Sequence, residues 1–148
     1  MKDESGLDLR ALEVRDWDLL DRAVSLLKKR WRPHWQQVAA AVRMESGNAY
    51  QAVNLDAHCG SCGVCAEPIA IGMGVAKGDQ TIDTIVAVRK SSRDGPDAPI
   101  KLVTPCGACR ELICDYGPNA FVILRRGDGY IKARARLLLP WKYDRDGA

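Results

Sequence analysis

Two continuous apolar runs constrain the fold of this chain more than any other feature of its sequence. They are IDTIVAVR at residues 82–89 and AFVILRR at residues 120–126. Both contain β-branched residues, and neither alternates regularly between apolar and polar positions. Strands with this pattern are buried on both faces of a sheet that helices cover. The two runs therefore predict a layered α/β protein.

The other segments supply the layers around these two strands. Leucines at three- and four-residue steps predict a helix over residues 8–31, which Pro33 ends, and similar patterns predict helices over 65–77 and 106–116. Further strands are expected at residues 38–44, 50–56 and 130–136. This order predicts one domain spanning residues 1–148, folded as a three-layer α/β/α sandwich with a mixed sheet of about five strands.

Composition and charge limit the partners that we expect. Apolar residues make up 47% of the chain and charged residues 28%, and the net charge of +3 is too small to indicate a polyanionic partner. No apolar run reaches the roughly 18 residues of a membrane helix, and the charged N-terminus lacks the apolar core of a signal peptide. We therefore expect a cytoplasmic protein with no nucleic-acid or membrane partner. Six cysteines in that compartment indicate metal or redox chemistry.

Cysteines begin two of the predicted helices. Cys106 and Cys109 are three residues apart directly after Pro105, so their sulfur atoms share a helix face and can reach one ion. Cys65 begins the helix before them. The free N–H groups and the dipole at a helix N-terminus favour thiolates. Three thiolates suit zinc with a fourth position left for water, so we expect one Zn²⁺ per chain.

Glu67, two positions after Cys65, is the candidate catalytic residue. A carboxylate there lies near the metal without having to bind it, and it can move a proton from water to a leaving group. Zinc deaminases carry H-x-E followed by P-C-x-x-C, with a glutamate that is not a ligand. This chain has CAE at residues 65–67 and PCGAC at 105–109, with cysteine in the histidine place.

From about Val38 to its C-terminus the chain resembles the cytidine deaminase family, and within it the bacterial blasticidin S deaminases. The segments that carry this resemblance are VCAEPIAIG, IDTIVAVR, TPCGACRELICDYGP and FVIL. The resemblance implies zinc-dependent hydrolytic deamination of a free cytosine nucleoside. Cytidine or deoxycytidine would become uridine or deoxyuridine, with release of ammonia. Blasticidin S or another modified cytosine nucleoside is the alternative substrate.

The resemblance also implies substrate-binding positions and an assembly. Family members hold the ribose with N-x-E on the strand before the first zinc ligand, and this chain has Asn54-Leu55-Asp56 there. Members with this type of C-terminal tail are usually tetramers, so a homotetramer is expected. The remaining implied contacts are the backbone of Ala66 to the pyrimidine, the carbonyl of Thr104 to the departing amine, Gln36 beside the base and Tyr143 over the site.

Asp56 replaces the glutamate of the family pattern, and the position after Glu67 departs from that pattern as well. Members with three cysteine ligands commonly have an arginine after the glutamate, where it offsets the thiolate charge, and this chain has Pro68. The two helix dipoles must then carry more of the compensation, or Arg110 assists them.

Other interpretations of these residues predict different proteins. A closed four-cysteine zinc site that includes Cys62 would be a non-catalytic module, with no role for Glu67. A polynucleotide deaminase would need a basic channel, which the modest charge disfavours. An iron–sulfur cluster is disfavoured because Ile69 stands where its fourth cysteine would be. The remaining residues are expected to have no direct role in chemistry: Cys59 and Cys62 in a loop, Cys114 in the core, Trp35 in packing, and His34 and His58 not as ligands. The alternative for His34 is a place in the lining of the substrate pocket.

Overall fold

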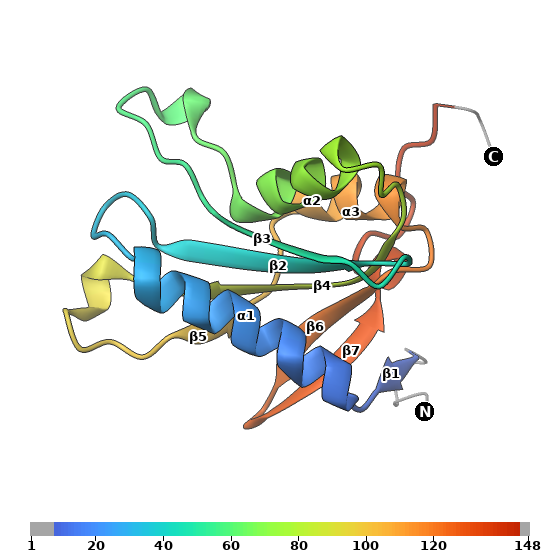
Figure 1. The fold of residues 1–148 in the computed structure, drawn as a ribbon, viewed down its shortest axis with the longest axis horizontal. Coiled ribbons are helices and arrows are strands. Elements are labelled where there is room, and N and C mark those ends of the chain that lie inside the picture. Colours follow the sequence, from blue (N-terminus) through green and yellow to red (C-terminus); the bar gives the residue numbers. More distant parts are fainter. Residues whose placement is uncertain (1–7, 146–148) are drawn as a thin grey trace.

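A computed structural model describes residues 8–145 of the chain and shows a mixed sheet with helices on both faces (Figure 1). The order along the sheet is β1-β7-β6-β4-β2-β3, and β5 pairs with β4 beside the end of β6. Among the described strands, β4 and β6 are the one parallel pair. The strands are β1 (Leu9–Arg10), β2 (Val38–Met44), β3 (Ala49–Val53), β4 (Ile82–Arg89), β5 (Lys101–Val103), β6 (Phe121–Arg126) and β7 (Gly129–Arg134).

Helix α1 (Val14–Arg30) covers one face of the sheet, and α2 (Ala66–Ala76) and α3 (Gly107–Tyr116) lie together on the other (Figure 1). Leu19 and Leu27 of α1 pack in one buried cluster with Val86 of β4. Ile71 of α2 and Ile113 of α3 pack in a second cluster on the opposite face. None of the described helices combines the length and apolar character that crossing a membrane requires.

The predicted three-layer sandwich is confirmed, although the sheet has seven described strands instead of about five. The first helix begins at Val14 and not at residue 8, because Leu9–Arg10 pairs with β7 and a capping box between Glu13 and Asp16 starts the helix. The predicted strand at 50–56 ends at Val53. The first seven residues of the predicted domain, and its last three, lie outside the described part.

Candidate metal centre and active site

A row of small residues lets the start of α2 approach the middle of the sheet. Ala40 of β2 pairs with Ala87 of β4, and Ala87 pairs with Val103 of β5. Ala66, the first residue of α2, is fully buried in a cluster with these two alanines. Larger side chains in this row would hold the helix away from the sheet. Val103 ends β5 three residues before Cys106, so the start of α3 comes to the same place.

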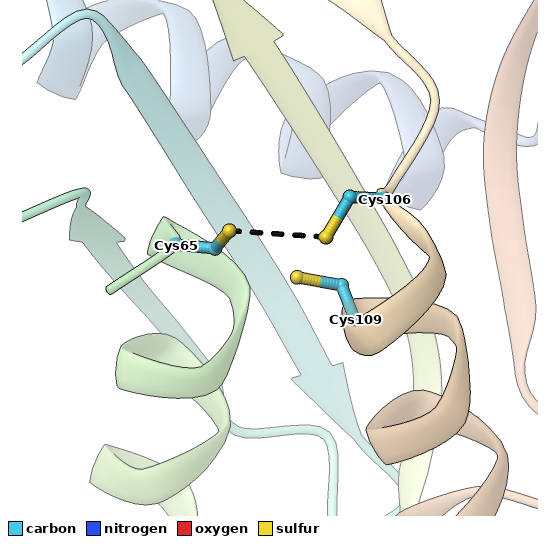
Figure 2. A group of neighbouring side chains, drawn as sticks. All are labelled: Cys65, Cys106 and Cys109. Atoms are coloured by element: carbon cyan, nitrogen blue, oxygen red, sulfur yellow. Dashed lines mark hydrogen bonds between the residues drawn. The ribbon is translucent and has the colours of Figure 1, made fainter. Parts of the chain in front are cut away.

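Three cysteine sulfur atoms meet where α2 and α3 begin (Figure 2). Cys65 and Cys106 are the residues that precede and cap the two helices, and Cys109 lies one turn into α3. The three Sγ atoms are all within 4.8 Å of one another, and those of Cys65 and Cys106 are 3.9 Å apart. Within residues 8–145, no other group of three or more histidine, cysteine or acidic side chains is close enough to hold a metal ion.

The donor set fits zinc. Tetrahedral zinc with Zn–S bonds of about 2.3 Å places its sulfur ligands about 3.8 Å apart, close to the separation of Cys65 and Cys106. Burial raises the pKa of the Cys65 thiol, and burial and the charge of Glu67 raise the pKa of Cys109. Burial also opposes ionisation of Cys106, but hydrogen bonds from Cys109 lower its pKa overall. Sulfur atoms packed this closely need a cation to become thiolates together, so these three residues are positioned to bind one metal ion.

Glu67 lies in the first turn of α2, beside the three sulfur atoms. Its side chain is buried, with 5% of the residue exposed, and burial raises the pKa of its carboxyl group. Hydrogen bonds from its own backbone N–H and from the Cys109 thiol oppose that rise in part. A buried carboxyl group next to a metal site is a candidate general acid and base, and a raised pKa makes it easier to protonate.

Arg110 does not contact the sulfur atoms in this structure. Its Nε donates to the carbonyl oxygen of Pro105 at 2.9 Å, and its Nη1 donates to the carbonyl oxygen of Leu138 at 3.2 Å. The guanidinium group therefore fixes the segment just before Cys106 and ties it to the C-terminal part of the chain. This arrangement supports a role for Arg110 in positioning the ligand loop.

Asn54 and Asp56, the predicted sugar-binding residues, lie in the segment just after β3. The Asn54 side chain is fully engaged with the backbone of the preceding turn: it accepts from the N–H groups of Gln37 and Val38 at 2.9 Å each and donates to the carbonyl of Trp35 at 2.8 Å. Asp56 is exposed and accepts only from the N–H of Ala57, at 2.9 Å. Asp56 is thus the freer of the two to meet a ligand.

The other predicted substrate contacts lie at different distances from the centre. Ala66 directly follows Cys65, and Thr104 is two residues before Cys106, so both are close in the chain to the candidate ligands. Gln36 is half-buried in a turn that its backbone closes with Arg32. Tyr143 is 76% exposed and lines a hollow between the C-terminal segment and α3, so the structure does not bring it to the sulfur atoms.

Trp35 and His58 were not expected to belong to a site, yet the structure brings them together. Their rings are nearly perpendicular, with centroids 5.2 Å apart, and they line a small pocket with Asp56. The sequence signal was weak, because neither residue lies in a motif. The one available signal was position: Trp35 lies just before β2, and His58 lies in the loop after β3.

The sequence and the fold are similar to those of known deaminases. Residues 14–125 match the model of the cytidine and deoxycytidylate deaminase zinc-binding region. Blasticidin-S deaminase of Bacillus cereus is 39% identical over 91% of this chain and 96% of its own length. A probable cytidine deaminase of Dictyostelium discoideum is 24% identical over 74% of this chain and 70% of its own length. The crystal structure of Bacillus anthracis cytidine deaminase has a TM-score of 0.74 at 22% identity, covering 87% of this chain and 89% of that one.

Proposed function

The chain belongs to the cytidine and deoxycytidylate deaminase family, a family of zinc-binding hydrolytic deaminases, and we propose on this premise that its substrate is a free cytosine nucleoside. Cytidine or deoxycytidine would give uridine or deoxyuridine and ammonia. The observation that carries the proposal is the meeting of three cysteine sulfur atoms within 4.8 Å at two helix N-termini, with buried Glu67 beside them. Cys65, Cys106 and Cys109 would hold the zinc.

Glu67 would carry the protons of the reaction. Zinc, when bound, lowers the pKa of a coordinated water to about 7 and so supplies a nucleophile at neutral pH. Glu67 takes a proton from the attacking water while the water oxygen bonds to C4 of the ring. It passes that proton to the ring nitrogen. It then moves the proton of the new C4 hydroxyl group to the amino group, which leaves as ammonia when the C4–N bond breaks and the C4 carbonyl forms. The raised pKa of the buried carboxyl group suits this exchange in both directions.

Backbone groups next to the ligands would place the base. The N-terminal end of α2 at Ala66 would contact the pyrimidine, and the carbonyl oxygen of Thr104 would accept a hydrogen bond from the departing amine. Ala66 is one residue and Thr104 two residues from a cysteine of the centre, so the positions of both groups depend on the same geometry. Gln36 would stand beside the base, and Asp56 would bind the sugar.

Blasticidin S, or another modified cytosine nucleoside, is the second candidate substrate. The 39% identity to a blasticidin-S deaminase over most of both chains favours it. Asp56 is also one carbon shorter than the glutamate of the family pattern, which leaves more room on the sugar side. A polynucleotide substrate is not supported, since the net charge is only +3.

We also propose that the protein is a cytoplasmic homotetramer with one domain per chain. In α2, Met73 and Val75 lie on either side of the buried Gly74 and are 45% and 38% exposed, and the only charged residue of this helix, Glu67, is buried. A helix that is apolar on both faces usually packs against a partner. A tetramer would also give Tyr143 a neighbouring site to cover. Free exposed thiols at Cys59 and Cys62 fit a reducing compartment.

The substrate proposal is tested with the zinc-loaded protein and a panel of nucleosides. Cytidine, deoxycytidine, N4- and 5-modified cytidines and blasticidin S are incubated with the enzyme, and the ultraviolet change on loss of the amine is followed. We expect turnover of at least one of them. A failure to deaminate any of them would overturn the proposed substrate class.

The mechanism is tested by Glu67→Gln. This variant should retain about one zinc per chain, because Glu67 is not proposed as a ligand. Its kcat should fall by about 10²- to 10⁴-fold, the usual contribution of general acid–base catalysis. Glu45→Gln, at an exposed turn far from the centre in sequence, is the matched control and should keep full activity. Full activity in Glu67→Gln would show that another group carries the protons.

A further inference from the structure

A small pocket lies beyond Asp56, formed by two segments that are distant in sequence. It has a volume of about 190 Å³ and is lined by His34, Trp35, Asp56, Ala57 and His58. Complete small-molecule sites usually have volumes of about 300–1,000 Å³. This pocket is therefore the right size for one part of a substrate.

The turn that forms one wall is held firmly in place. His34 has a φ of 65°, in the left-handed region that residues other than glycine seldom adopt. The Asn54 side chain accepts hydrogen bonds from two backbone N–H groups just after His34 and donates one to the carbonyl of Trp35, and a contact of 3.4 Å joins His34 Nδ1 to Ser92 Oγ. Uncommon backbone conformations that the surroundings impose are concentrated at ligand-binding positions.

The lining combines aromatic faces, hydrogen-bond donors and one negative charge. In the described part of the chain, the indole N–H of Trp35 and the ring nitrogens of His58 have no hydrogen-bond partner. The Arg32 guanidinium lies 5.2 Å from the centroid of the Trp35 ring, outside the lining. Asp56 is the one acidic residue among those that line the pocket. These groups can bind a polar substituent, and the carboxylate repels an anionic one.

One isolated antiparallel β-bridge, between Leu55 and Val64, lies between the pocket and the metal centre in the chain. Leu55 and Val64 exchange backbone hydrogen bonds of 2.9 and 2.8 Å. Asp56 follows Leu55 and Cys65 follows Val64, so the pocket and the first cysteine ligand flank one pair of residues. In a cytosine nucleoside N1 lies across the ring from C4, so with C4 at the centre the N1 substituent points away from the metal. A sugar bound by Asp56 would adjoin this pocket, because Asp56 lines it.

We propose that Trp35 and His58 are specificity-determining residues that contact the N1 substituent of a cytosine nucleoside, and that their pocket accepts polar, non-anionic substituents. This inference rests on the proposed function. Asp56 is the proposed sugar contact, and Trp35 and His58 would form a further part of the substrate site. Neither of these two residues belongs to a recognised motif of the chain.

The test measures how Trp35→Ala and His58→Ala change the choice among substrates. The zinc-loaded enzymes are assayed with cytidine, deoxycytidine, blasticidin S and cytidine 5′-monophosphate. We expect the ratio of kcat/KM between at least two substrates to change about tenfold in each variant, mainly through KM. A loss of folded protein would lower every kcat/KM alike and leave the ratios unchanged. Trp17→Ala is the matched control, because Trp17 also packs edge-on against a ring, that of Tyr130, on the α1 face of the sheet.

The proposed exclusion of anionic substituents is tested with a variant of Asp56, and binding is also measured without turnover. The wild type should have a higher kcat/KM for cytidine than for cytidine 5′-monophosphate. Asp56→Asn should reduce the ratio of these two values, because it removes the negative charge. The same ligands are titrated calorimetrically into the zinc-loaded Glu67→Gln background, with and without the pocket substitutions. Unchanged ratios and affinities in both pocket variants would overturn this inference while leaving the deaminase proposal intact. Absence of turnover by the wild type would instead refute the proposed function.

Discussion

Cys62 and Cys65 belong to one repeated C-x-x-C stretch, yet the structure gives them different environments. Cys65 caps α2 and meets two other sulfur atoms, whereas Cys59 and Cys62 are exposed in the loop before it. Their local spacing is the same, so spacing alone could not separate them. The helix that begins after Cys65, and the matching pattern at Cys106, allowed the sequence to predict which sulfur atoms meet.

Substitution of Cys65 should separate the open metal centre from a closed four-cysteine site. We expect Cys65→Ser to reduce bound zinc from about one per chain to near zero, because serine is a poor zinc ligand and two thiolates remain. Cys62→Ser, three residues away in the same stretch, should keep its zinc. The metal content of the purified variants is measured by mass spectrometry of the element. Zinc loss in Cys62→Ser would point to a closed site.

Asn54 shows where a motif predicts a position but not the environment of a side chain. The resemblance placed it at the ribose, and the structure shows its amide group bonded to the backbone of Trp35, Gln37 and Val38. A direct ribose contact by Asn54 therefore stays a prediction. The pairing of Trp35 with His58 depends on the same folded turn, and no local pattern in the sequence encodes it.

Among the elements, α1 is joined to the sheet by a buried ionic cluster. The Asp16 carboxylate accepts from Arg43 Nη2 of β2 and from Lys132 Nζ of β7, at 2.7 Å each, and Asp16 is fully buried. Arg43 and Lys132 are 27 and 116 residues from Asp16 in the chain. The sequence predicted the helix and both strands from their periodicity, but periodicity carries no information on which charges pair across them.

Asp16→Asn should destabilise the fold by about 3–5 kcal/mol at pH 7, since it leaves Lys132 and Arg43 buried with less compensation. Although burial opposes ionisation, hydrogen bonds from Lys132 and Arg43 lower the pKa of Asp16 in the folded state. The stabilisation is therefore present above the unfolded pKa of about 3.9 and is lost as the pH falls through the folded value. Urea unfolding of both proteins at several pH values measures it.

The control for this prediction is Asp18→Asn, an exposed carboxylate on the same helix, which should change the free energy of unfolding by no more than about 0.5 kcal/mol. The difference in stability between wild type and Asp16→Asn should shrink in acid. A difference that stays constant from neutral pH down to about pH 3 would contradict an ionised Asp16 in the folded state.

Short strands account for the difference between the predicted and observed sheets. β1 has two residues and β5 has three, too few for a pattern of period two to be recognised. Each exists because a longer strand offers it free backbone groups: β1 pairs with β7, and β5 pairs with the end of β4 that β6 leaves unpaired. Long apolar runs, by contrast, were sufficient to predict the layers.

At the scale of the whole molecule, α2 faces two environments. Its inner face packs against Ala40 and Ala87 of the sheet, and Glu67 on this helix is buried beside the metal centre. Away from the sheet, Met73 and Val75 on its two flanks are exposed to solvent. The two faces belong to one rigid element, so a partner that covers the outer face would also fix the start of the helix.

Met73→Glu should therefore weaken the proposed tetramer, because it would bury a charge in an apolar contact. The wild type should have a mass of about 65 kDa, four times the 16.3 kDa of one chain, by light scattering after gel filtration, and the variant should be smaller. Val14→Glu, at an exposed apolar position on α1, is the control and should stay the size of the wild type. The smaller variant should keep its zinc, because all three cysteines come from one chain, and lose activity if Tyr143 completes a neighbour's site. A wild type of 16.3 kDa in solution would refute the tetramer.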